Sequence, residues 1–233
     1  DFGCDNVIDL AIDLIRSDMQ ELVKQDSDFE PDDVVIHLRL GDALQGSYDE
    51  GIGLLPDNTY AQIIRDVEHE KGIQMKTISI VTLPFTTDRV RSFDSHLVGR
   101  SKLFALDLSA FLKESFPHAK VKIDNGPLET TLRAYSRLIR AKKLAICGPS
   151  TFCTWPVLGI SKDAVGYLYE SRTHSPWAMN APKYLPNIRT YSAKRFANHK
   201  ISQVSDEEIY RWLRNEAAFG PVCFAPLGST RGC

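Results

Sequence analysis

Hydrophobic and polar positions along this chain predict helices and strands in alternation. Residues 6 to 25 carry apolar side chains at helical spacing, and the β-branched run Val34 to Leu38 that follows is typical of a buried strand. Residues 56 to 71 predict a helix that begins at a proline and is ended by Gly72. The run Thr77 to Val81 predicts the second strand.

The same alternation continues through the rest of the chain. Residues 43 to 53 and 174 to 186 are expected to be loops, the second because it holds three prolines. Ser205, with Glu208 three residues later, forms the capping box that begins a terminal helix. The other expected elements are a helix over Ser101 to Ser115, a strand over Val121 to Asp124, a helix from Pro127 to Arg140, a strand over Lys143 to Cys147, a helix over Thr151 to Leu158, a last strand over Ala164 to Leu168 and a terminal helix from Ser205 to about Phe219.

Strands that are apolar on both faces, each followed by a helix, indicate a parallel sheet covered by helices on both sides. We therefore predict an α/β fold with a Rossmann-like doubly wound parallel sheet, whose ligands bind at the carboxyl ends of the strands. Residues 1–220 are expected to form one Rossmann-like domain, followed by a Gly/Pro-rich tail over residues 221–233. The chain opens at Asp1 without a Met, so we expect an N-terminal partner domain to lie outside it.

The composition limits the classes of partner that this chain is expected to bind. Lys and Arg number 28 against 30 Asp and Glu, giving a net charge of -2, so no nucleic-acid partner is expected. No apolar run approaches the ~20 residues that cross a bilayer, so a membrane is expected only through a segment outside this chain. Five cysteines without a CxxC pair argue against a zinc site. They are expected either all to be unpaired or to include a Cys223–Cys233 bond in an oxidising compartment.

The segment HLRLGD ends the first predicted strand. Side chains alternate along a strand, so His37 and Arg39 point to the same side and could together hold an anion, with the guanidinium matching phosphate oxygens two at a time. The alternative is that Arg39 pairs with Asp42 and that His37 is a satisfied core histidine.

The segment CGPSTF joins a later strand to a helix. The hydroxyls of Ser150 and Thr151, with the backbone N–H groups of the helix start, form an anion-binding corner, unless Ser150 simply caps the helix. The arginines at positions 133, 137 and 140 lie on one helical face, either as a basic wall for a nucleotide or as an ordinary solvated face. The P-loop, GxSxG and GxGxxG patterns are absent from the sequence.

Together, HLRLGD and GPSTFCTWPVLG resemble the HxRxGD-type signature and the later S-S/T-F segment of the fucosyltransferases that form α1,2- or α1,6-linkages or modify protein O-sites. The resemblance spans Val34 to Gly159. It implies the C-terminal donor domain of a GT-B glycosyltransferase that transfers fucose from GDP-fucose to a glycan or protein acceptor with inversion, without a cofactor or metal. It also implies the lumen of the Golgi or endoplasmic reticulum, with the cytoplasm as the alternative location.

The resemblance also implies roles for single residues. Arg39 would hold the donor diphosphate and stabilise the leaving GDP, and Asp42 would order Arg39 or meet the sugar. Glu50, together with Asp49, is the local candidate for the carboxylate that activates the acceptor hydroxyl. The catalytic set is then Arg39, Asp42 and Glu50, and the donor-binding set is His37, Arg39, Ser150, Thr151 and Phe152.

Two alternative functions remain open at the level of sequence. The first is a glycosyltransferase of the same architecture that uses another nucleotide sugar. The second is a non-catalytic nucleotide- or carbohydrate-binding module. Leu40, where many relatives carry a second Arg, and Lys142 and Lys143, where relatives often carry an acidic residue, favour the second alternative.

Overall fold

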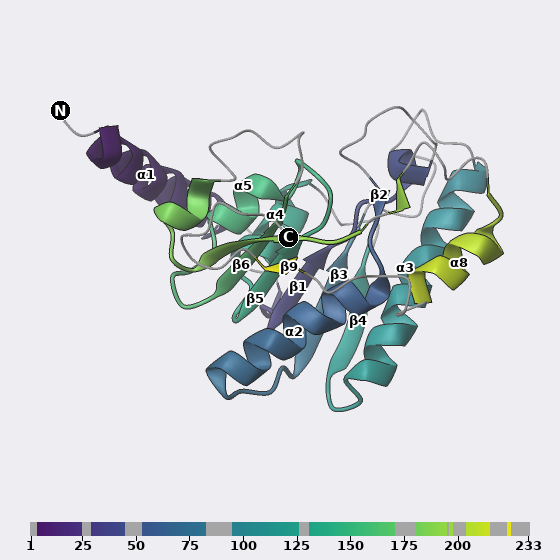
Figure 1. Cartoon of the computed structure of the whole chain (residues 1–233). Coiled ribbons are helices and arrows are strands. Elements are labelled where there is room, and N and C mark those ends of the chain that lie inside the picture. The colour runs from purple at the N-terminus through teal and green to yellow at the C-terminus, as the bar shows by residue number, and fades with distance from the viewer. Residues whose placement is uncertain are drawn as a thin grey trace.

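A seven-stranded sheet passes through the centre of the computed structural model (Figure 1). The structure describes residues 4–24, 29–44, 53–82, 95–125, 131–170, 180–194, 196–197, 204–214 and 223–224. The sheet order is β4-β3-β1-β5-β6-β7-β9. Its strands are β1 (Val34–His37), β3 (Thr77–Val81), β4 (Lys120–Asp124), β5 (Leu144–Cys147), β6 (Val165–Tyr169), β7 (Ile188–Ser192) and β9 (Cys223–Phe224).

All pairings among the first six strands of this order are parallel, and only β9 runs antiparallel to its neighbour β7. Read by sequence, the parallel strands follow the order of the doubly wound dinucleotide-binding sheet, which starts in the middle and grows first to one side and then to the other. The predicted α/β, Rossmann-like class is thereby confirmed.

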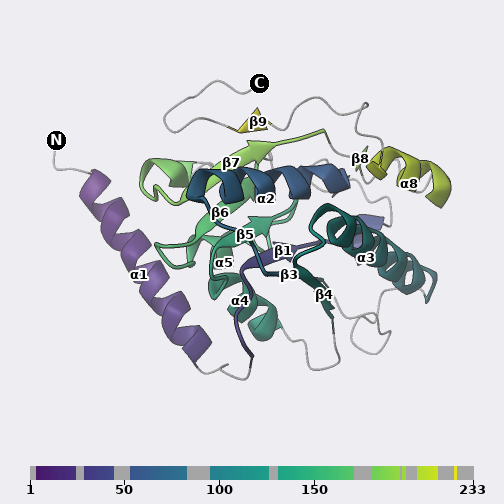
Figure 2. The same ribbon diagram turned by 90° about the horizontal axis from the view of Figure 1, so that it is seen from below.

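Helices cover both faces of the sheet (Figure 2). One face carries α2 (Asp57–Lys71), α3 (Ser95–Ser115) and α8 (Asp206–Arg214). The other face carries α4 (Thr131–Ile139) and α5 (Thr154–Leu158), with α1 (Cys4–Lys24) packed against α4. A separate pair of two-residue strands, β2 (Gly53–Leu54) and β8 (Phe196–Ala197), is antiparallel.

Alternation along β1 explains why both faces are apolar. Val34 and Ile36 belong to the core under α2 and α3, whereas Val35 belongs to the core under α4 and α5. All three side chains are fully buried. Burying a side chain of this size contributes roughly 1.5–3 kcal/mol, so the central strands hold both helix layers in place.

Helix α8 is fastened to α3 at both of its ends. Arg100 donates two hydrogen bonds to Asp206, from Nε at 2.8 Å and from Nη2 at 2.6 Å. At the other end, Arg214 Nη2 lies 2.8 Å from Asp107 and its Nε lies 3.3 Å from the buried carboxylate of Asp57. Burial and the nearby charge of Asp107 raise the pKa of Asp57 well above its usual range.

Several predicted boundaries agree with the structure. The strand Thr77–Val81 and the helix Asp57–Lys71 have the expected limits, and Gly72 follows that helix in a left-handed conformation. One of the two hydrogen bonds of the predicted capping box is present, since the N–H of Glu208 donates to Ser205 Oγ at 3.3 Å. The end of this helix expected near residue 219 and the helix start expected at residue 127 lie outside the described residues.

Other boundaries were predicted wrongly. The strand after β5 is not the last, because β7 and β9 extend the sheet, and β9 falls within the expected tail. Helix α3 begins at Ser95 rather than Ser101, and α5 begins only at Thr154. The expected loop over residues 43–53 contains the end of a short 3-10 helix, Gly41–Leu44, and the start of β2.

Candidate functional site

The two segments singled out in the sequence leave the same edge of the sheet from neighbouring strands. From β1 the chain builds towards β3 and β4, and from β5 it builds towards β6 and β7, so the order reverses between β1 and β5. His37, the last residue of β1, is in register with Cys147, the last residue of β5. Ligands of doubly wound sheets bind at this reversal, outside the carboxyl ends of the strands.

His37 lies on the face covered by α4 and α5 and is 7% exposed. Its ring stacks on Phe152 with 4.9 Å between centroids, and Phe152 in turn meets the ring of Tyr135 edge-on at 4.8 Å. Burial, and secondarily the positive charge of Arg39, lowers the pKa of His37 to about 3. His37 therefore enters the site as a neutral imidazole and not as a second cation beside Arg39.

The Nδ1 atom of His37 is buried and has no hydrogen-bond partner within the described part of the chain. The same holds for Oγ1 of Thr82, which directly follows β3 at the neighbouring strand end. A buried polar atom without a partner costs about 1–3 kcal/mol, and a bound ligand or an ordered water removes this cost by supplying the missing hydrogen bond.

Arg39 and the residues after it form the outer part of the first segment. The Arg39 side chain is half-buried. Gly41 adopts a φ of 69°, which only glycine takes without strain, and its N–H donates to Ser101 Oγ at 3.1 Å. This turn explains the glycine of the HLRLGD segment and ties it to α3.

The remaining residues proposed for catalysis are only partly placed. The backbone of Asp42 belongs to the short 3-10 helix that follows Gly41. Asp49 and Glu50, the predicted candidates for the carboxylate base, lie outside the described residues. The candidate site is therefore built from His37, Arg39 and the segment after β5.

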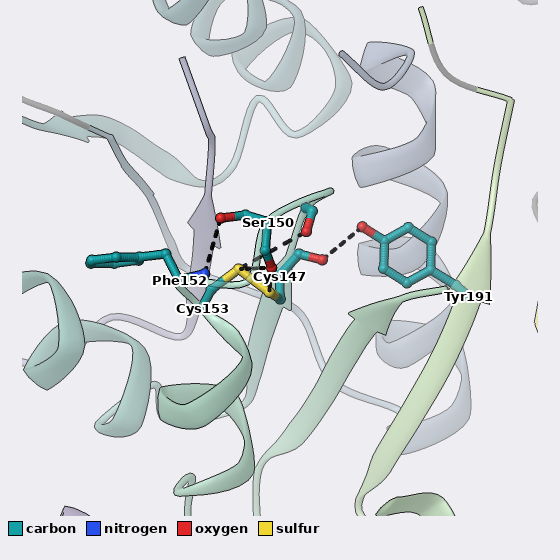
Figure 3. Close-up of a disulfide and its surroundings, with 6 residues drawn as sticks. Cys147, Ser150, Phe152, Cys153 and Tyr191 are labelled. Carbon is teal, nitrogen blue, oxygen red and sulfur yellow. Dashed lines mark hydrogen bonds between the residues drawn. A yellow bond between two sulfur atoms is a disulfide. The ribbon is translucent and has the colours of Figure 1, made fainter. Parts of the chain in front are cut away.

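The second segment is a loop closed by a disulfide. Cys147, at the end of β5, is bonded to Cys153, immediately before α5 (Figure 3). The expectation that all five cysteines are unpaired is wrong for these two. The predicted Cys223–Cys233 bond cannot be placed, because Cys233 lies outside the described residues.

Ser150 and Phe152 occupy this loop together with Thr151, and none of the three is helical. Ser150 is 3% exposed, and its Oγ accepts a hydrogen bond from the N–H of Phe152 at 3.2 Å (Figure 3). Thr151 is exposed and Phe152 is half-buried. The expected helix-start corner is thus a disulfide-closed loop instead, and α5 has only five residues.

Gly148 lets the two segments approach each other closely. A Cβ at this position would lie 3.1 Å from the carbonyl oxygen of His37 and 3.3 Å from the hydroxyl of Tyr60. An alanine at this position would require the His37 carbonyl or the Tyr60 hydroxyl to move by a few tenths of an ångström. We call the group formed by His37, Arg39, Gly148, Ser150 and Phe152 the switch-point corner.

The arginines on α4 are not a solvated face. Arg137 is 7% exposed, and its Nη2 lies 3.2 Å from Asp124 Oδ1. Lys122 Nζ lies 2.9 Å from the buried carboxylate of Asp32, whose Oδ2 is also 4.0 Å from Arg137 Nη1. We call Asp32, Lys122, Asp124 and Arg137 the ion network.

Phe29 supports these arginines from outside the sheet. The guanidinium groups of Arg137, Arg140 and Arg133 lie 4.5, 4.8 and 5.6 Å from its ring centroid. Such contacts stabilise a guanidinium by about 0.5–1 kcal/mol at exposed sites. Sequence reasoning missed this arrangement because Phe29 and Asp32 stand far from α4 along the chain.

Comparisons with known proteins add no assignment. No protein-family model matches the chain, and no curated protein sequence matches it significantly. Among the described helices, none is long and apolar enough to cross a membrane. Within the same ranges, no group of three or more His, Cys, Asp or Glu side chains is placed to hold a metal ion.

Proposed function

We propose that the chain is the donor-binding domain of a glycosyltransferase that transfers fucose from GDP-fucose to a glycan or glycoprotein acceptor with inversion. The observation that carries the proposal is the position of the two segments. HLRLGD and GPSTF, which together resemble the fucosyltransferase signatures, leave adjacent strands at the reversal point of a doubly wound sheet. That is where a sheet of this topology binds a nucleotide.

The chemistry of the switch-point corner supports a diphosphate as ligand. Breaking the bond between a sugar and a diphosphate builds negative charge on the leaving phosphate oxygens. The positive guanidinium of Arg39 stabilises this negative charge, and it does so more strongly in the transition state than in the ground state. His37 is neutral, and its buried Nδ1 is available for a hydrogen bond to the donor.

The disulfide supports the proposed location. Disulfides persist in the secretory pathway and are rare in the reducing cytosol. A bond between Cys147 and Cys153 thus favours the lumen of the Golgi or endoplasmic reticulum, where glycan and glycoprotein acceptors are modified.

Nucleotide binding tests the proposal and separates it from its alternatives. Calorimetric titrations with GDP, UDP and ADP should show binding of GDP in preference to the other two. A preference for UDP would replace fucose transfer with the transfer of another sugar, and the absence of binding by all three would remove the nucleotide-sugar proposal. Binding of GDP without hydrolysis of GDP-fucose or transfer from it by the full-length protein would favour a non-catalytic module.

A further inference from the structure

The Cys147–Cys153 disulfide lies inside the proposed donor site. It joins the end of β5 to the residue before α5, and it encloses the loop 148–152 that contains Ser150 (Figure 3). Both cysteines are fully buried. The bond is thus placed where it acts on the shape of one short loop, whereas the sheet is held by its own ladders and core.

Both ends of the bond are held by other elements. The hydroxyl of Tyr191 on β7 donates to the carbonyl oxygen of Cys147 at 3.0 Å, as Figure 3 shows. The carbonyl oxygen of Cys153 accepts the N–H of Val157 at 3.1 Å, in the first turn after the loop. The disulfide therefore connects two residues that other elements hold in place. The distance between these two residues limits the conformations of the loop 148–152.

The carbonyl groups of the loop turn towards the sulfur atoms. The carbonyl oxygen of Ser150 lies 3.4 Å from Cys147 Sγ and 3.7 Å from Cys153 Sγ, and that of Gly148 lies 4.0 Å from Cys153 Sγ. A trans peptide unit is planar, with its C=O and N–H pointing in opposite directions, and the described chain has no cis peptide bonds. The N–H of Thr151, which shares a peptide unit with the Ser150 carbonyl, therefore points away from the disulfide.

This orientation sets the electrostatic character of the loop. With the Ser150 carbonyl turned inwards, the outer side of that peptide presents an N–H donor, which attracts an anion. Rotation of the same peptide would present a carbonyl oxygen there and repel a phosphate. Holding a loop in its binding conformation before the ligand arrives raises affinity, because less ordering remains to be done on binding.

We infer that the Cys147–Cys153 disulfide is a positioning element for the donor diphosphate, so that the affinity of the site depends on whether this bond is formed. The inference rests on the proposed function. Dithiothreitol converts the bond to two thiols and is itself oxidised to its cyclic disulfide. The loop then loses its cross-link, while the β5 pairings to β1 and β6 remain.

The test compares oxidised wild type, wild type treated with dithiothreitol, and the double variant Cys147→Ala/Cys153→Ala. Titrations use GDP, inorganic pyrophosphate and guanosine, and far-UV circular dichroism and thermal melting establish that each sample is folded. Loss of the bond should weaken GDP and pyrophosphate by about tenfold, which corresponds to about 1.4 kcal/mol. The affinity for guanosine, which lacks phosphates, should change by less than about twofold, or about 0.4 kcal/mol.

Dithiothreitol should have no effect on the double variant, which serves as the control for the other cysteines. If the variant does not fold, reduced wild type, with its thiols counted, replaces it. Equal GDP affinity with and without the bond would overturn the inference and leave the proposed function standing. Equal weakening of guanosine and GDP would show a purely structural role and also overturn it. Failure of oxidised wild type to bind GDP would instead contradict the proposed function itself.

Discussion

The switch-point corner and the ion network both place polar side chains at the sheet, but their charges are arranged differently. In the ion network, the carboxylates of Asp32 and Asp124 lie within 4.0 Å of Lys122 and Arg137. In the switch-point corner, His37 is neutral and its Nδ1 has no partner within the described part of the chain. The first region holds its charged groups in ion pairs, and the second holds a neutral imidazole. A buried atom without a hydrogen bond within the described residues occurs in both, at Oδ2 of Asp32 and at Nδ1 of His37.

This difference separates a structural role from a binding role more clearly than residue type does. From the sequence, Arg39 was expected to hold the donor diphosphate, and the arginines of α4 were expected to form either a basic wall for a nucleotide or an ordinary solvated face. Breaking a buried ion pair destabilises a fold strongly, because it leaves a charge without compensation. Removing a ligand contact instead affects binding and leaves the fold nearly unchanged.

The largest effect is expected from Arg137→Met in the ion network. The substitution removes the guanidinium 3.2 Å from Asp124, so that Lys122, 3.8 Å away, is the one cation left beside this carboxylate in the described part of the chain. We expect the free energy of unfolding to fall by about 3–5 kcal/mol, measured by urea denaturation. The GDP affinity of the folded fraction should stay at the wild-type value, and a specific loss of GDP binding would assign α4 to the nucleotide site.

Arg39→Ala should show the opposite behaviour. Loss of a charge-assisted hydrogen bond costs about 1.5–3 kcal/mol, so calorimetry should show GDP affinity weakened by about 10- to 150-fold. The urea midpoint should change little, since Arg39 is only half-buried. Arg211→Ala, which removes an exposed guanidinium from α8, is the matched control and should bind GDP like wild type.

Because His37 is neutral in the folded protein, it makes the free energy of unfolding depend on pH. Its pKa is about 3 in the folded protein and ~6.5 in an unfolded chain. The unfolded state thus binds more protons between these values, and stability is complete above pH ~6.5 and falls as the pH drops. Between pH 7 and pH 5, wild type should lose about 2 kcal/mol more than His37→Gln in urea denaturation. Parallel pH profiles of the two proteins would show that His37 is charged or exposed.

The smallest effects concern two glycines with different surroundings. Gly148→Ala places a methyl group 3.1 Å from the His37 carbonyl oxygen, and we expect a loss of about 1 kcal/mol in thermal or urea unfolding. Gly99→Ala on α3 meets nothing within 4 Å and should stabilise the helix by about 0.5–1 kcal/mol. Equal effects at both positions would mean that β1 and β5 do not approach closely at Gly148.

The central part of the fold could be predicted because its signals are local. The β-branched run at β1, the exact limits of β3 and α2, and the strand-helix alternation follow from residues next to one another. β7 was not predicted because Arg189 and Thr190 interrupt its apolar pattern. Arg189 forms an ion pair with Glu70, which is far from it along the chain, so the sequence gives no local reason for an arginine in this strand. Two-residue strands such as β9 carry too little pattern to be found at all.

The position of the candidate site was also predictable, since strand ends in a parallel sheet meet at one edge. Its chemistry was not. His37 is neutral because it is buried beneath Phe152. The Cys147–Cys153 bond forms across a turn, where the sequence predicted that the helix would already have begun at Thr151. Both depend on contacts that appear only after the strands have paired.

Hydrogen exchange with and without GDP tests most directly where the ligand binds. We expect slower exchange in residues 38–44 and 148–153, at the ends of β1 and β5, and no change in β4 and α4. Protection confined to β4 and α4 would move the nucleotide to the ion network. Unchanged exchange throughout the chain at saturating GDP would contradict a nucleotide site between β1 and β5.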